Sequence, residues 1–146
     1  MDILKKDNIH LNQSFSNKEE AIRFTGQVLV DGGYVSEEYI DEMIQREHDL
    51  STYMGNYIAI PHGTENSNDM IKKSGLSVIQ VPKGINFGTK EEEKEVRVIF
   101  GIAGVDNQHL DILSNIAIYA SEVENVLKLA EMESKEEILG ELGGIE

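Results

Sequence analysis

The feature that most constrains the fold of this chain is a nearly continuous apolar run at residues 96–103, with the sequence VRVIFGIA. A strand with one face in water alternates polar and apolar side chains, whereas a strand covered on both faces is apolar almost throughout. Such a strand needs packed layers above and below its sheet. The run therefore predicts a central strand of a layered domain.

Two shorter apolar runs of β type precede this strand. One covers residues 57–60 and ends at Pro61, and the other covers residues 76–81 and is followed by Pro82. Because proline lacks the backbone N–H and has a fixed φ, we expect each strand to stop at its proline. The charged stretch at residues 90–95 is most simply a solvated loop between the last two strands.

Two segments with helical periodicity precede the strands. Ser16 and Glu19 have the spacing of a capping box, and Gly32-Gly33 supply a left-handed stop, so the first helix lies between them. A second helix begins at Ser36 and fades near residues 47–48. The side chains expected to face inward from these two helices are Ala21, Ile22, Thr25, Val28, Leu29, Tyr39, Ile40, Met43 and Ile44.

Helical periodicity also follows the strands. A helix begins at Asp106, and two further helical pieces cover residues 122–132 and 134–139, where Ser134 and Glu137 repeat the capping-box spacing. The side chains expected inside the first of these helices are Leu110, Leu113, Ile116, Ala117 and Ala120. Helices on both sides of a group of short apolar strands favour an α/β fold, a single layered domain with helices on both faces of its sheet.

Length and charge narrow the possible functions. The 146 residues suit one domain, so we expect residues 1–146 to form a single domain. The 13 Lys+Arg against 27 Asp+Glu give a net charge of −14, which argues against binding to nucleic acid or to an anionic membrane surface. No apolar run reaches the roughly 18–20 residues of a membrane-spanning helix, and we expect no direct membrane insertion.

The chain contains no cysteine. Disulfides, thiolate zinc sites and cysteine nucleophiles are therefore excluded, and the composition fits a reducing cytosol. The N-terminal residues also lack the apolar stretch of a signal peptide. We expect a soluble cytoplasmic protein.

Without cysteine, nucleophilic chemistry near neutral pH falls first to the four histidines. His62 follows Pro61 at the end of an apolar run and precedes Gly63, which places its ring at a sheet edge on a backbone able to turn sharply. Such a position presents a ring to solvent or to a ligand. On this tripeptide alone, a plain turn after a strand is the simpler interpretation.

His109 and Arg46 are the next candidates. With Asp106 as N-cap, His109 is the third residue of its helix, where the positive helix end attracts anions and lowers the pKa of an imidazole. An ordinary exposed histidine is the alternative. Arg46 lies at the C-terminal end of the second helix, where pairing with the negative helix end is the simpler interpretation. His10 and His48 are interpreted as surface or structural residues.

Several other chemistries have no motif in this sequence. It lacks a P-loop, a dinucleotide-binding fingerprint after a strand, a His-Glu-x-x-His zinc motif, an acidic calcium loop and a Gly-x-Ser-x-Gly elbow. The histidines are too dispersed to predict a metal site. Chemistry that is carried by histidine and needs no nucleotide remains.

Two long blocks of the sequence are more specific than any single histidine. They are residues 53–64, YMGNYIAIPHGT, and residues 100–113, FGIAGVDNQHLDIL. The first resembles the active-site signature of enzyme IIA of the bacterial phosphotransferase system, mannitol/fructose class, and the second resembles a later block of the same family. EEAIR at residues 19–23, GYV at 33–35 and the distance of Arg46 from the signature also match. This similarity in order over nearly the whole chain outweighs the plain-turn interpretation of His62.

The resemblance implies a role for each candidate. His62 would accept a phosphoryl group from phosphohistidine on the carrier protein HPr, as a tele-phosphohistidine, and pass it to a cysteine of enzyme IIB or IIBC on a separate chain. His109 would support the transfer, and Arg46 would stabilise the phosphoryl charge. The family fold is a mixed sheet of about five strands with helices on both faces. No metal or cofactor is implied.

The resemblance also bears on the sugar. Gly63-Thr64 and residues 84–88, GINFG, are more similar to the mannitol branch, which implies a phosphotransferase that drives uptake and phosphorylation of mannitol. The alternative is a nitrogen-type or fructose-type enzyme IIA, with a regulatory protein-binding role or with fructose as the sugar. A sensor domain once fused to a transcription regulator is a third possibility. All three would be phosphorylated at His62.

Overall fold

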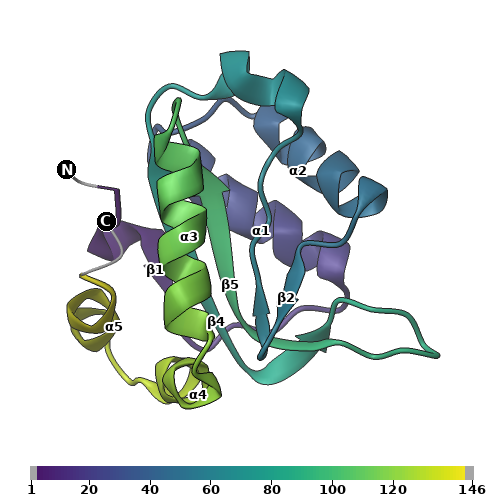
Figure 1. Cartoon of the computed structure of the whole chain (residues 1–146), viewed down its shortest axis with the longest axis vertical. Helices are drawn as coiled ribbons and strands as arrows, with labels where there is room; N and C mark the ends of the chain where they lie inside the picture. The colour runs from purple at the N-terminus through teal and green to yellow at the C-terminus, as the bar shows by residue number, and fades with distance from the viewer. Residues whose placement is uncertain (1–2, 144–146) are drawn as a thin grey trace.

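The computed structural model describes residues 3–143, which build a five-stranded mixed sheet (Figure 1). In spatial order the strands are β1 (Ile9–His10), β4 (Gly75–Asn86), β5 (Glu95–Ala103), β3 (Ile58–Ala59) and β2 (Tyr53–Gly55). The β1–β4 and β3–β5 pairs are parallel, and the β4–β5 and β2–β3 pairs are antiparallel. The expected mixed sheet of about five strands is confirmed.

Helices cover both faces of this sheet (Figure 1). One apolar core packs the sheet against α1 (Lys18–Asp31) and α2 (Glu38–Asp49). A second core packs its other face against α3 (Gln108–Ala120), α4 (Val123–Glu131) and α5 (Lys135–Leu142). Two 3-10 helices, η1 (Lys6–Asn8) and η2 (Glu65–Met70), complete the helical elements of the described residues. The α/β layered architecture is confirmed, and no helix within residues 3–143 has the length and apolar character to span a bilayer.

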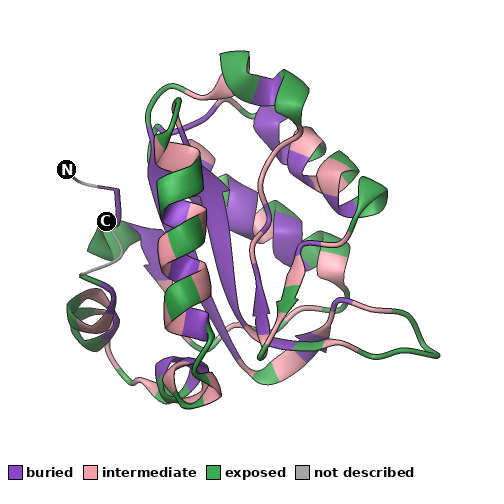
Figure 2. Ribbon diagram, in the orientation of Figure 1, coloured by how far each residue is buried: buried purple, intermediate pink, exposed green. Residues whose placement is uncertain are grey.

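β5 is the central strand expected from its apolar run, and it is buried along nearly its whole length (Figure 2). Val98, Phe100 and Ile102 belong to the core beneath α3 and α4, whereas Ile99 and Ala103 belong to the core beneath α1 and α2. All five side chains are completely buried. Because β5 contributes to both cores, its position is fixed from both sides, and so is the point at which the chain leaves its C-terminal end.

The expectation that Pro82 closes its strand is wrong. β4 continues to Asn86, and its register against β5 shifts between Gln80 and Ile85. Gly84 within this stretch has a φ of +85°. An irregular stretch leaves some backbone groups outside the ladder, so a proline without an N–H is tolerated there. The loop that follows projects from the sheet (Figure 1), and residues 89–93 are exposed as expected.

The N-terminal ends of the first helices differ slightly from the predictions. α1 is capped by Asn17, whose side chain accepts a hydrogen bond from the Glu20 N–H at 2.9 Å, and not by Ser16. The Ser16 N–H instead donates to the Glu20 carboxylate at 3.1 Å. α2 begins at Glu38 rather than at Ser36. The expected inward residues of both helices are buried, apart from Ile44, which is half-buried.

The later helices show one agreement and two corrections. Ser134 caps α5 as expected, accepting from the Glu137 N–H at 3.1 Å. α3, however, begins at Gln108, and Asp106 is not its N-cap: its φ is +54°, in the left-handed region that aspartate tolerates. Leu110, expected inside, is 63% exposed.

The buried face of α3 explains the position of Leu110. It is formed by Ile112, Ile116 and Ala120, which are spaced by four residues. Leu110 precedes Ile112 by two residues and therefore lies on nearly the opposite side of the helix.

Candidate functional site

The three predicted site residues come together where β5 ends. After β3 the chain continues alongside β5: the Ile102 N–H donates to the Pro61 carbonyl at 3.0 Å, and His62 forms a parallel bridge with Ile102. The connection from β5 then leads into α3, which carries His109 in its first turn. The rings of His62 and His109 lie 5.1 Å apart between centroids, at 56° to each other.

A surface cavity of about 850 Å³ contains all three residues. Its wall is formed by side chains of α2, by the segment after β3 and by the β5–α3 connection. The lining residues are Tyr39, Arg46, His62, Gly63, Thr64, Glu65, Ser67, Asn68, Ile71, Gly104, Val105, Asp106, His109 and Leu110. The N-terminal end of α3 borders this cavity, and a helix N-terminus favours an anion.

The tautomer of His62 follows from its backbone partner. Its Nδ1 lies 2.8 Å from the Ile60 carbonyl oxygen. A carbonyl oxygen can only accept, so the Nδ1 of a neutral ring must carry the proton and donate it. The Nε2 of His62 is then the nitrogen with a free lone pair. A neutral imidazole in this tautomer can act as a nucleophile through Nε2.

The surroundings keep the His62 ring neutral. Burial lowers the pKa of His62 from its ordinary value of 6.5. The hydrogen bond to Ile60 acts in the opposite direction, the charges of His109 and Arg46 lower the pKa further, and the negative charge of Glu47 raises it. Burial likewise lowers the pKa of His109. Both rings are therefore neutral at pH 7, and each neutral ring has one N–H donor and one lone pair.

Arg46 contributes a permanent positive charge to the cavity. It lies in the last turn of α2, and its Nη1 donates to the carbonyl oxygen of Leu50. This contact fixes one end of the guanidinium and leaves the other donors of the group for a ligand. The pairing with the helix end considered from the sequence is thus present, and Arg46 lines the cavity as well.

Tyr39 is a site residue that sequence reasoning placed only in the core. Its hydroxyl donates to the Ile102 carbonyl at 2.8 Å and accepts from the Gly63 N–H at 2.9 Å. Burial raises the pKa of Tyr39 to about 12, so the hydroxyl stays protonated. It therefore joins the residue after His62 to β5. The helical periodicity identified Tyr39 as buried, and nothing in the pattern indicated this partner.

Two glycines allow the close approaches at this site. A Cβ on Gly104 would lie 2.4 Å from the Cα of His109, and a Cβ on Gly63 would lie 2.3 Å from the Ser67 Oγ and 2.5 Å from the Tyr39 ring. Real side chains do not come this close. Only glycine at these positions lets α3 start against the end of β5 and lets the chain turn directly after His62.

The other two histidines lie elsewhere. His10 is in β1, where its ring packs edge-on against Phe24 at 5.2 Å between centroids, and His48 is exposed near the end of α2. Both agree with the surface or structural interpretation. Among residues 3–143, no group of three His, Cys, Asp or Glu side chains is arranged to hold a metal ion.

The cavity is thus chemically suited to an anion that reacts at His62. It combines a nucleophilic nitrogen, a neighbouring neutral histidine, a guanidinium and a helix N-terminus, and the last three are donors that stabilise negative charge. Glu65 and Asp106 add negative charge to its lining.

Comparisons with known proteins agree with one another and with the family resemblance of the sequence. The family model described as "Phosphoenolpyruvate-dependent sugar phosphotransferase system, EIIA 2" matches residues 2–142. The mannitol-specific phosphotransferase enzyme IIA component of Enterococcus faecalis is 55% identical over 138 residues, covering 94% of this chain and 95% of that relative.

Two solved structures from Escherichia coli are also similar, each with 38% sequence identity. The crystal structure of IIA mannitol has a TM-score of 0.88 and covers 95% of this chain and 98% of its own. The complex of enzyme IIAMtl and phosphorylated enzyme IIBMtl has a TM-score of 0.89, with 97% of both chains covered.

Proposed function

Because this chain belongs to the EIIA type 2 family of the phosphoenolpyruvate-dependent sugar phosphotransferase system, we propose that it carries a phosphoryl group on His62 during mannitol uptake. The donor is phosphorylated HPr, and the acceptor is a cysteine of a separate mannitol enzyme IIB or IIBC chain. Mannitol as the sugar is supported by the relative from Enterococcus faecalis, and enzyme IIB as the partner by the complex from Escherichia coli. Residues 1–146 act as one domain in the cytoplasm.

The observation that carries this proposal is the free Nε2 of a neutral His62 inside a cavity of donors. In the first transfer, the Nε2 lone pair forms a new P–N bond while the P–N bond of the donor phosphohistidine breaks. His62 keeps its Nδ1 proton, which remains bonded to the Ile60 carbonyl. In the second transfer, a cysteine thiolate attacks phosphorus and the lone pair returns to Nε2. Both steps exchange one P–X bond for another, so neither consumes a nucleotide.

Arg46 and His109 stabilise the charge of the transferred group. A phosphoryl group brings about −1.5 to −2 charges at pH 7. Phosphoryl transfer depends mainly on positioning and on cations or donors around the equatorial oxygens. We assign Arg46 to these oxygens as the fixed cation and the neutral His109 as a second donor. The N-terminal end of α3 adds the field of its helix dipole.

The test is phosphoryl uptake by the variant His62→Ala. Incubation with enzyme I, HPr and phosphoenolpyruvate should label the wild type with an acid-labile, base-stable phosphate, and mannitol enzyme IIB should remove the label. His62→Ala should take up no label, whereas His48→Ala, which changes an exposed histidine of α2, should label normally. Labelling of folded His62→Ala would disprove the assignment. A labelled wild type that cannot pass phosphate to mannitol enzyme IIB would instead favour a regulatory role or another sugar.

A further inference from the structure

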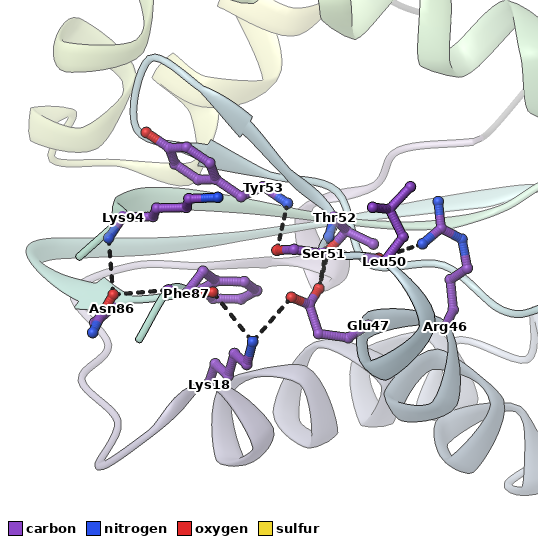
Figure 3. Close-up of polar contacts among 11 residues, drawn as sticks. Lys18, Arg46, Glu47, Leu50, Ser51, Thr52, Tyr53, Asn86, Phe87 and Lys94 are labelled. Atoms are coloured by element: carbon purple, nitrogen blue, oxygen red, sulfur yellow. Dashed lines mark hydrogen bonds and ion pairs between the residues drawn. The ribbon is translucent and has the colours of Figure 1, made fainter. Parts of the chain in front are cut away.

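Glu47, the residue after Arg46, is a carboxylate buried at the end of α2, with only 4% of its surface exposed (Figure 3). One of its oxygens accepts from the Thr52 backbone N–H at 2.8 Å and from the Thr52 Oγ1 at 2.6 Å. The other oxygen lies 3.3 Å from the Lys18 ammonium. Lys18 also donates to the Phe87 carbonyl at 3.2 Å. Both carboxylate oxygens of Glu47 thus have partners.

Stability alone does not account for this arrangement. A buried carboxylate loses the hydration it has in water, and its attraction to a partner repays that loss only partly. Well-packed apolar residues often stabilise a fold equally well or better than a buried ion pair. Glu47 instead positions Thr52, because its hydrogen bonds determine where Thr52 lies relative to α2.

The first consequence concerns Arg46. The Glu47–Thr52 hydrogen bonds close the short connection between α2 and β2, and Leu50 lies inside that connection. The Leu50 carbonyl is the acceptor for the Arg46 guanidinium (Figure 3). The Leu50 side chain is 69% exposed, so burial in the core does not fix this residue. The closed connection fixes Leu50, and the Leu50 carbonyl that accepts from Arg46 is held with it.

The second consequence concerns His62. The Thr52 carbonyl accepts the Ile60 N–H at 3.0 Å, and the Ile60 carbonyl accepts the His62 Nδ1–H at 2.8 Å. Three successive contacts therefore lead from the Glu47 carboxylate through Thr52 and Ile60 to the ring of His62. The last contact sets the His62 tautomer.

We infer that Glu47 is a positioning residue for phosphoryl transfer, which acts through Thr52 to hold the backbone carbonyls that orient both His62 and Arg46. The inference rests on the proposed function of His62 and Arg46. Lys18 holds the carboxylate from the opposite side and ties it to the end of β4. Glu47 touches neither the phosphoryl group nor the two side chains that it orients, and this orienting effect passes through the backbone. Its negative charge also raises the pKa of His62, as a smaller effect than burial.

The test compares Glu47→Ala with two conservative variants. Glu47→Ala removes every hydrogen bond to Thr52, Glu47→Gln keeps an amide oxygen as acceptor, and Thr52→Val removes only the Oγ1 contact. In Glu47→Ala we expect phosphoryl transfer from HPr to be slower by up to about 100-fold, the cost of misplacing reacting groups by about an ångström. Glu47→Gln should recover most of the rate, and Thr52→Val should lie between the two.

A spectroscopic readout separates positioning from general stability. The ring ¹⁵N chemical shifts of His62 should report the Nδ1–H tautomer in the wild type and a mixture with the Nε2–H tautomer in folded Glu47→Ala. Loss of stability alone would leave the tautomer of the folded molecules unchanged. Asp49→Ala is the matched control, because Asp49 lies in the same helix turn and accepts from the exposed Gln45 side chain at 2.9 Å. It should leave both readouts at their wild-type values.

The outcomes distinguish this inference from the proposed function. An unchanged His62 tautomer in folded Glu47→Ala would overturn the positioning role, whatever the transfer rate. If Glu47→Ala fails to fold, an unchanged tautomer in Thr52→Val would overturn it equally. If the wild type takes up no phosphate, the proposed function fails, but the tautomer measurement uses no phosphate and still tests whether Glu47 orients the ring.

Discussion

At the scale of single residues, the chemistry depends on the protonation of His62 and His109. Burial lowers the pKa of both rings below 6.5. For His62 the hydrogen bond to Ile60 opposes this shift without reversing it. The neutral form that the proposed reaction needs is therefore the form that the fold favours, and the same preference links stability to pH.

We predict that the free energy of unfolding falls as the pH decreases through 6.5. In the unfolded chain both histidines return to a pKa near 6.5, so below this pH the unfolded state binds more protons than the folded state. Protonation then favours unfolding until the pH reaches the lower folded pKa values. Well above pH 6.5 both states are neutral at these positions, and the contribution of the two histidines is constant.

Urea unfolding at a series of pH values across 6.5 measures this effect. Carboxylates also contribute in acid, so the informative quantity is the difference between the wild type and the double variant His62→Gln, His109→Gln. The double variant should lose less stability than the wild type between neutral pH and the region below 6.5. Parallel curves for the two proteins would contradict the prediction.

At the scale of elements, the site depends on how closely α3 approaches β5. Gly104 lies between them, and a Cβ there would meet the Cα and Cβ of His109 at 2.4 and 2.5 Å. We predict that Gly104→Ala displaces the start of α3, destabilises the protein by about 1–3 kcal/mol as overpacking typically does, and slows phosphoryl transfer. Urea unfolding and the HPr-dependent labelling assay measure the two effects.

Gly140→Ala is the matched control for that variant. Gly140 lies in α5, where an added Cβ would meet no atom within 4 Å. Alanine in a helix interior is favoured over glycine by about 0.5–1 kcal/mol, so this variant should be slightly more stable and should transfer phosphate normally. Equal effects of the two substitutions would show that the contact at His109 is not what requires glycine.

The elements were largely predictable because their signals are local. A nearly continuous apolar run located β5, and apolar periodicity located the inward faces of α1 and α2. The spacing of Ser134 and Glu137 located the start of α5. The largest failure occurred where a contact with a distant segment decides the structure. β4 passes through Pro82 because β5 continues to pair with it beyond the irregular stretch.

The candidate site was predictable in its parts but not in its connections. The family resemblance indicated His62, His109 and Arg46, and the fold brings them into one cavity. Glu47 and Tyr39 gave no such signal, since a glutamate near a helix end is ordinarily exposed. Their roles depend on hydrogen bonds with Thr52, Ile102 and Gly63, which the apolar pattern of the sequence does not indicate.

At the scale of the whole molecule, charge governs how the proposed partners meet. The chain carries a net charge of −14, while the cavity gathers Arg46 and the positive end of α3. Glu65 and Asp106 are exposed and line the same cavity. A partner with a basic surface would be attracted to the acidic molecule as a whole, and its phosphoryl group would be attracted to the cationic centre of the site.

We predict that phosphoryl transfer from HPr weakens steeply as salt is added, because the Debye length shrinks from about 10 Å at 0.1 M to about 3 Å at 1 M. Stopped-flow or quenched labelling over this range measures the rate. The double variant Glu65→Gln, Asp106→Asn should show a shallower salt dependence, since it removes two negative charges beside the cavity. Glu91→Gln, Glu93→Gln removes two charges from the exposed loop between β4 and β5 and should change the slope less. A rate that is indifferent to salt would mean that the acidity of this protein plays no part in meeting HPr.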